Sequence, residues 1–277
     1  MQAFVEKIAR RGFAGLTVAL AFVAAACATV PAGNGAAGER HVTVTTPDGV
    51  ADALLFTPAR AKAPAVILWG DLGGLRPTVA DLGRKLSAEG YVVLVPNAFY
   101  RSAALDGAAA SDVEYATRNK EWRAAASDDA ILSDAKAYLA FLDGQPQVDR
   151  SVKAGTVGYD IGGAYAFLTA RAAPDRIGAV AAIHPLAIAT ARPNSPHLFV
   201  NQSKAAYYVA FGKNADEREP GDKTDVSKAL ADAGLTGTVV VLSGDHGFGL
   251  ADNKAYDMAS AEQAWSATLT LFAASLK

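Results

Sequence analysis

The sequence predicts an α/β fold in which a doubly wound, mostly parallel sheet is flanked by helices. Three observations support this prediction. Short apolar runs rich in Val, Ile and Ala recur along the chain, as in strands that are buried on both faces. Stretches of helical length with amphipathic or alanine-rich character separate these runs. The chain has 277 residues, 51% of them hydrophobic, which is enough to build one large core.

The first 27 residues have the pattern of a secretory signal. Lys7, Arg10 and Arg11 precede an apolar stretch over 13–26 that ends in small residues. This stretch is short for a membrane span, so we expect it to direct export. The Arg10-Arg11 pair resembles a twin-arginine signal, and Cys27 is a candidate for lipidation, which would tether the protein to a membrane. We therefore expect a periplasmic protein or an outer-envelope lipoprotein of a bacterium.

Composition limits the partners that we expect. Residues 28–40 are rich in Ala and Gly and predict a flexible tether, followed by a single domain over 41–277. A net charge of −2 gives no electrostatic case for binding nucleic acid. One cysteine excludes a disulfide framework, and the four histidines lack metal-ligand spacing. No Gly-rich stretch has the phosphate-binding or dinucleotide-binding spacing. The oligomeric state stays open.

The first half of the domain begins with an antiparallel hairpin. Residues 41–46 alternate in polarity, Pro47-Asp48-Gly49 is a turn signal, and 51–57 return as the partner strand. Buried strands are predicted over 65–69 and 91–96, with a helix over 78–89 between them. Residues 97–127 form a long polar connection, and loops of this length are usually functional.

The second half continues the alternation of helices and strands. Helices are predicted over 128–142, 163–171, 225–233 and 258–276, and strands over 152–157, 177–183, 205–211 and 237–242. A Pro-containing loop is expected from 184 to 204. No long insertion follows the strand over 177–183, so we expect no cap domain.

The strand over 152–157 leads into Gly158-Tyr159-Asp160-Ile161-Gly162, which has the pattern of a nucleophile elbow. The flanking glycines allow a sharp turn and close packing of helix on strand. The N-terminus of the following helix stabilises an anion at the corner. The central residue is Asp160, where serine or cysteine would be expected for acyl transfer.

Two further candidates follow later strands. In this kind of fold, catalytic groups lie at the carboxyl ends of the strands. Asp216 follows the strand over 205–211, and His246 follows the strand over 237–242. The order nucleophile, acid, histidine is that of the α/β-hydrolase fold. In comparison with the family that the chain resembles, Asp216 lies one residue further from Gly212, so Glu217 and Asp222 stay open as alternatives.

The chain resembles the dienelactone hydrolases from about Pro64 to Leu271. The motifs that carry the resemblance are the elbow and the segments 64–68, 88–96, 99–101, 142–149, 194–197, 246–248 and 256–257. The resemblance implies a hydrolase that acts on a small ester or lactone without a cofactor. It also implies a catalytic triad of Asp160, Asp216 and His246.

The resemblance implies roles for further residues. The backbone N–H groups of Leu72 and Ile161 would form the oxyanion hole, and Asp71 would lie near the resting nucleophile. Arg101 matches the position that holds the substrate's carboxylate in this family. The second arginine of the family, just after the catalytic histidine, has no counterpart in 247–252, which leaves specificity for an acidic lactone open.

An aspartate at the elbow changes the chemistry that is available. Attack of Asp160 on an ester would give a mixed anhydride, and the intermediate would expel the carboxylate again. At a saturated carbon a carboxylate can displace a halide or open an epoxide, as in dehalogenases and epoxide hydrolases, and Trp69 and Trp122 are candidates to hold a leaving halide. Alternatively, Asp160 serves as a general base on water. Loss of catalysis would leave a ligand-binding protein, and a substituted serine or cysteine enzyme is a further alternative.

Overall fold

The structure is a computed structural model that describes residues 38–103 and 118–277. The predicted signal over 1–27 lies outside the described residues, as does the predicted tether up to residue 37. Residues 38–40, which we assigned to the tether, already belong to the first strand. Within the described segments, no helix combines the length and the apolar character needed to cross a membrane.

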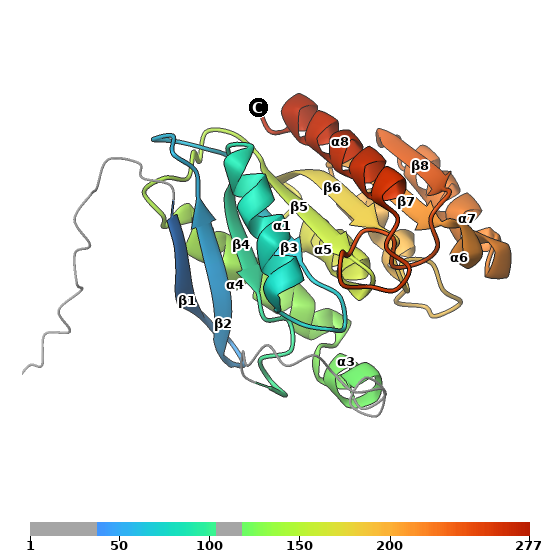
Figure 1. Cartoon of the computed structure of the whole chain (residues 1–277), viewed down its shortest axis with the longest axis horizontal. Coiled ribbons are helices and arrows are strands. Elements are labelled where there is room, and N and C mark those ends of the chain that lie inside the picture. Colours follow the sequence, from blue (N-terminus) through green and yellow to red (C-terminus); the bar gives the residue numbers. More distant parts are fainter. Residues whose placement is uncertain (1–37, 104–117) are drawn as a thin grey trace, which may run out of the picture. The chain divides into compact units, whose positions relative to one another are not determined.

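An eight-stranded sheet forms the centre of the domain, in the order β1-β2-β4-β3-β5-β6-β7-β8 (Figure 1). β1 pairs antiparallel with β2, and β2 pairs antiparallel with β4. All other neighbours are parallel, which confirms the predicted sheet. The strands are β1 (Gly38–Thr46), β2 (Gly49–Thr57), β3 (Ala65–Trp69), β4 (Val92–Pro96), β5 (Ala154–Tyr159), β6 (Ile177–Ile183), β7 (Ala206–Gly212) and β8 (Gly237–Leu242).

Helices cover both faces of this sheet (Figure 1). The helices α1 (Pro77–Ala88) and α8 (Met258–Ser275) pack on one face. The helices α4 (Asp128–Asp143), α5 (Ile161–Ala172) and α7 (Gly221–Asp232) pack on the other. The central strands β3, β4 and β5 are buried along their whole length, because helices shield both of their faces from water.

Local signals explain where two of the helices begin. The side chain of Ser127 caps α4 by accepting a hydrogen bond from the Ala130 N–H at 3.3 Å. The side chain of Asp257 caps α8 by accepting one from the Ser260 N–H at 2.7 Å. Each cap satisfies a backbone donor that the first turn of a helix leaves without an intrahelical partner. The acidic start of α4 also complements the positive end of the helix dipole.

Several short helical segments lie where the sequence predicted loops. They are η1 (Arg118–Trp122), α3 (Arg123–Ala125), the 3₁₀ helix η2 (Pro196–Gln202) and α6 (Lys213–Arg218). None is long enough to show a repeating apolar face, which is the signal that identifies helices in a sequence. The segment α6 has a consequence for the site because it carries Asp216.

The strand–helix corner at β5 and α5 is possible only because its glycines lack side chains. A Cβ on Gly158 would lie 1.8 Å from the carbonyl oxygen of Gly162. A Cβ on Gly162 would lie 2.5 Å from the carbonyl oxygen of Gly70. Helix α5 therefore starts at Ile161, two residues earlier than predicted, and packs its first turn directly against the ends of β5 and β3.

Candidate active site

Asp160 occupies the corner between β5 and α5 in a backbone conformation that residues other than glycine rarely adopt. Its φ is 54° and its ψ is −121°. A non-glycine residue in this region is strained and persists only where the surrounding structure holds it. Its N–H donates to the Ile183 carbonyl at 3.2 Å, and its carbonyl accepts from the Leu186 N–H at 3.0 Å. The corner is therefore a strained turn that connects β5 to α5.

The structure brings Asp160 and His246 together, as predicted. The Nε2 atom of His246 lies 2.9 Å from Oδ1 of Asp160, and the Asp160 side chain is only 7% exposed. Burial raises the pKa of Asp160, but the hydrogen bond and charge of His246 and the Ile161 N–H outweigh this effect and lower the pKa below its usual value. Asp160 is therefore ionised at neutral pH. Its second oxygen, Oδ2, is buried and has no hydrogen-bond partner among the described residues.

We predicted that Asp216 contacts His246, but the structure shows no such contact. Its Oδ2 accepts a hydrogen bond from Lys223 at 2.9 Å, and its Oδ1 is buried without a partner in the part of the chain that the structure describes. Residues 38–103 and 118–277 show no hydrogen bond between the His246 ring and a carboxylate of Asp216, Glu217 or Asp222. Asp216 lies within the first turn of α6, where it pairs with Lys223 on α7.

Asn214 instead supports His246, and sequence reasoning missed it. Its Oδ1 accepts a hydrogen bond from the backbone N–H of His246 at 2.7 Å. A Cβ on Gly212 would lie 2.6 Å from the same backbone nitrogen, so the His246 loop packs tightly against the end of β7. The only sequence signal for this contact is a short amide side chain just after a predicted strand, which is too common to identify a role.

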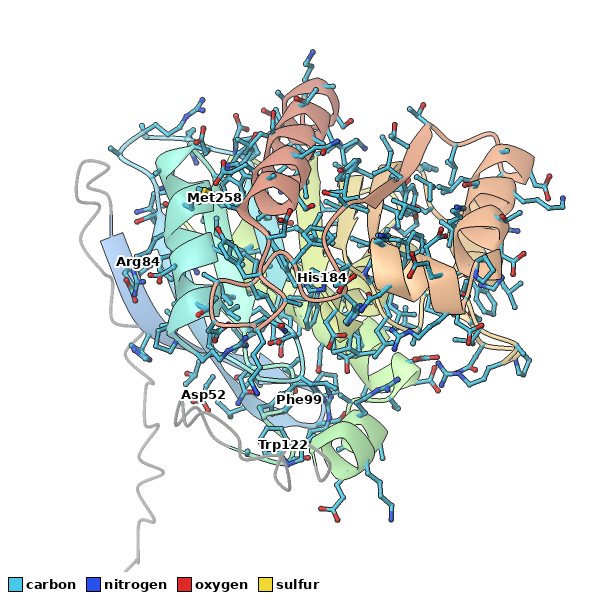
Figure 2. The ribbon with its side chains drawn as sticks, turned by 45° about the vertical axis from the view of Figure 1, so that its right-hand side comes forward. Asp52, Arg84, Phe99, Trp122, His184 and Met258 are labelled. Atoms are coloured by element: carbon cyan, nitrogen blue, oxygen red, sulfur yellow. The ribbon has the colours of Figure 1, made fainter. Side chains whose placement is uncertain are left out.

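A second histidine lies beside the pair. His184, labelled in Figure 2, follows β6 with a φ of 36° and is 1% exposed. Its ring meets the His246 ring at 5.2 Å between centroids, edge to face. Burial lowers the pKa of His184 to about 3, so its ring is neutral at physiological pH. His184 follows β6 and His246 follows β8, so their contact arises from the arrangement of the strands in the sheet. No local sequence pattern indicates it.

The loop after β3 carries Asp71 and Leu72. Asp71 forms an ion pair with Arg76, which also binds Asp252 at 2.6 Å. Burial raises the pKa of Asp71, and the charge of Asp160 adds to this effect, while Arg76 opposes it. Asp71 is therefore close enough to interact electrostatically with Asp160, although its hydrogen bonds go to Arg76 and to the Gly73 N–H. The Leu72 N–H has no hydrogen-bond partner within the described segments, as an oxyanion donor requires.

Arg101 is engaged in an ion-pair cluster, which is at odds with the role implied by the resemblance. Its guanidinium donates to both oxygens of Asp134, at 2.7 and 2.8 Å, and to Asp48 at 2.7 Å. The Asp134 side chain is fully buried and also accepts from the Tyr100 hydroxyl at 3.1 Å. A buried carboxylate needs such a partner because an isolated charge in the interior is costly. The contacts of Arg101 are those of a structural residue.

Replacing Arg101 with methionine is therefore expected to destabilise the domain by about 3 to 5 kcal/mol, because it leaves Asp134 buried without its counter-ion. Urea denaturation measures this change. Asp48→Asn is the matched control: the Asp48 side chain is 51% exposed, and we expect a loss of about 1 kcal/mol or less. A stable Arg101→Met variant that loses affinity only for acidic substrates would contradict the structural role.

The two tryptophans do not share a site. Trp69 is fully buried, and its indole N–H donates to the Thr169 hydroxyl at 3.0 Å. Its predicted role in substrate binding is therefore wrong, because the whole side chain belongs to the core. Trp122 packs against Phe99 at 5.6 Å between ring centroids (Figure 2). No ring contact joins Trp69 to Trp122 among the described residues.

A cavity of about 230 Å³ adjoins the corner at the start of α5. Ile161 and Tyr165 line it from α5, Arg123 from α3, and Arg192 and Asn194 from the loop after β6. The described residues contain no cluster of three or more His, Cys, Asp or Glu side chains that could hold a metal ion. The site thus consists of a carboxylate–imidazole pair, a free backbone donor and a polar cavity.

Comparisons with known proteins agree with the resemblance described above. The Dienelactone hydrolase family matches residues 51–276. A "Putative carboxymethylenebutenolidase" of Synechocystis sp. is 26% identical over 227 residues, which covers 79% of this chain and 89% of that protein. A carboxymethylenebutenolidase of Pseudomonas putida is 32% identical over 121 residues, covering 43% of this chain and 49% of that protein.

A solved structure has the same fold. A dienelactone hydrolase-like promiscuous phosphotriesterase from metagenomic libraries superposes with a TM-score of 0.72 at 19% identity, covering 88% of this chain and 100% of that one. The eight-stranded, mostly parallel sheet of this chain and its flanking helices have the α/β-hydrolase fold that the sequence predicted. Because the family match extends over nearly the whole described domain, this chain belongs to the dienelactone hydrolase family of hydrolases.

Proposed function

We propose that the chain hydrolyses a small ester or lactone, and that a water molecule rather than Asp160 attacks the carbonyl carbon. The observation that carries this proposal is the arrangement of the Asp160 carboxylate. One oxygen is bound to His246 Nε2 at 2.9 Å, and the other has no partner among the described residues. An ionised carboxylate in this arrangement can hold a water against the substrate and can share that water's proton with an imidazole.

The reaction needs one proton to move in and out of the Asp160–His246 pair. As the water oxygen bonds to the carbonyl carbon, the water releases a proton to the pair, and the C=O electrons move onto the carbonyl oxygen. When the carbonyl re-forms, the bond to the leaving oxygen breaks, and the pair returns the proton to that oxygen. One water is consumed, an acid and an alcohol form, and the pair returns to its starting state.

The developing oxyanion would be stabilised by a backbone donor. Leu72 offers an N–H that has no partner in the described segments. The Ile161 N–H stabilises the charge of Asp160 in the free protein, as the lowered pKa of that carboxyl indicates. Leu72 is therefore the donor that is available for the substrate.

A second candidate function is binding without catalysis, and the position of Asp216 favours it. A histidine base normally has a carboxylate that orients its ring, and here the expected carboxylate is bound to Lys223. A closed ion pair of Asp160 and His246 inside an intact cavity would then hold a ligand without converting it. A third candidate, attack of Asp160 on a saturated carbon, rests on the free Oδ2 atom.

A substrate panel separates the three candidates. The purified protein is mixed with 4-nitrophenyl acetate, δ-valerolactone and 1-bromobutane, and the release of nitrophenolate, acid and bromide is followed. We expect turnover of the ester and the lactone without release of bromide. Bromide release without ester hydrolysis would identify Asp160 as a nucleophile at carbon. Binding of these compounds without any turnover would identify a binding protein.

A further inference from the structure

The cavity beside the corner holds a buried polar group that the proposed reaction does not use. Tyr165, on the second turn of α5, lines the cavity together with Ile161 and is 3% exposed. Its hydroxyl has no hydrogen-bond partner in the part of the chain that the structure describes. Buried hydroxyl groups are nearly always paired, so an unpaired one next to a reaction centre points to a partner that arrives with the ligand.

Burial and nearby charged groups both affect the Tyr165 hydroxyl. Burial raises the pKa of Tyr165, and the charges of Arg123, Asp160 and Asp128 modify it. Arg123 and Asp128 line the cavity, and Asp160 is the corner residue. Tyr165 therefore lines the cavity together with Arg123 and Asp128, and its raised pKa keeps the hydroxyl protonated as a hydrogen-bond donor.

The cavity wall offers more donors than acceptors. Arg123 and Arg192 contribute guanidinium groups, and Tyr165 contributes its hydroxyl. The one carboxylate in the wall, Asp128, already accepts a hydrogen bond from Asn194 at 2.5 Å. A ligand that brings an acceptor oxygen can pair with the Tyr165 hydroxyl, whereas a purely hydrocarbon group would leave this hydroxyl unpaired.

We propose that this cavity takes the acyl portion of the substrate and that the Tyr165 hydroxyl donates a hydrogen bond to an oxygen on it. Tyr165 is then a specificity-determining residue that selects esters whose acyl group carries an alkoxy or hydroxy oxygen close to the carbonyl. The inference rests on the proposed ester hydrolysis and adds a substrate class to it. A site built to pair with a polar atom discriminates against an analogue that lacks this atom, because its own polar group stays unpaired.

Two esters of the same shape test this inference. In 4-nitrophenyl methoxyacetate an ether oxygen replaces one methylene group of 4-nitrophenyl butyrate. The ratio of kcat/KM for the two esters is measured for the unsubstituted protein and for Tyr165→Phe. We expect Tyr165→Phe to lower this ratio about tenfold, mainly through the methoxyacetate ester. Comparing the ratios between proteins cancels the difference in intrinsic reactivity of the two esters.

Tyr138→Phe is the matched control. The Tyr138 hydroxyl is also buried without a partner among the described residues, and both tyrosine rings contact Trp69 at 5.6 Å between centroids, but only Tyr165 lines this cavity. We expect the ratio to be unchanged in this variant. Both substitutions remove a buried unpaired hydroxyl, so neither is expected to lower the melting temperature. A reduced ratio in Tyr165→Phe therefore reports on the ligand and not on folding.

The outcomes separate this inference from the proposed function. Turnover of both esters with the same ratio in the unsubstituted protein and in Tyr165→Phe would overturn the inference alone. Absence of turnover for both esters would refute the proposed function. In that case the matched ketones methoxyacetone and 2-pentanone are titrated by NMR. A preference for methoxyacetone that is lost in Tyr165→Phe would support the inference, and equal preferences in the two proteins would overturn it.

Discussion

Replacing His246 with alanine is expected to lower kcat/KM for ester hydrolysis by about 100-fold to 10,000-fold. The imidazole is the only group that hydrogen-bonds to the Asp160 carboxylate through a side chain among the described residues, with Nε2 at 2.9 Å from Oδ1. Without it the proton released by the attacking water has no acceptor other than Asp160, and no imidazole remains to share that proton with the carboxylate. Steady-state rates with 4-nitrophenyl acetate measure the loss.

Two further variants keep this result interpretable. His246→Ala leaves the charge of Asp160 buried without its partner, which is destabilising in itself. His246→Gln retains a hydrogen-bond donor but cannot exchange a proton at neutral pH, so we expect it to fold and still to be inactive. His41→Ala removes an exposed histidine on β1 and is expected to retain full activity. Full activity in both His246 variants would show that another group carries the proton.

Replacing Asp160 with cysteine is expected to convert the protein to covalent acyl transfer. The corner would hold the new side chain at the same strained φ of 54°, within reach of His246. A thiolate attacks an ester and forms a stable acyl-enzyme, whereas a carboxylate would form an anhydride that reverts to reactants. We expect a burst of about one equivalent of nitrophenolate per protein and a matching increase in protein mass.

Asp160→Asn is the control for this conversion. It keeps the shape of the side chain and removes both the charge and the capacity to form an acyl-enzyme, so we expect neither a burst nor steady-state turnover. A burst from the unsubstituted protein would contradict the proposed direct attack by water. Failure of Asp160→Cys to acylate, in a folded protein, would show that the corner and His246 are not aligned for chemistry at a carbonyl.

The sequence was sufficient for the fold because the signals for its elements are local. Buried strands such as β3 and β6 are continuous apolar runs, and their observed bounds equal the predicted ones. Helix α5 begins earlier than predicted because Gly162 lies inside its first turn, where a close approach to β3 requires glycine. Helix propensity alone penalises glycine, so packing of helix on strand decides the boundary.

The central pair was predictable for a similar reason. Asp160 lies in a local motif, and His246 follows the last strand, so topology alone brings both to one edge of the sheet. The partners of charged side chains were not predictable. Asp216 binds Lys223, and Arg101 binds Asp134, through contacts between separate elements that no spacing rule encodes. A resemblance to a family assigns a role to a position, but the neighbouring charges of this chain decide whether the side chain can perform it.

Oxygen labelling tests the central claim most directly, because it shows which atom attacks the carbonyl carbon. A single turnover of a small ester is run in H₂¹⁸O with the protein in excess, and the acid product and the peptide that contains Asp160 are analysed by mass spectrometry. Direct attack by water predicts that the label appears in the acid product in the first turnover and that the Asp160 peptide keeps its mass. An unlabelled first product together with ¹⁸O in the Asp160 carboxylate would show that Asp160 itself attacks, and would contradict the proposed mechanism.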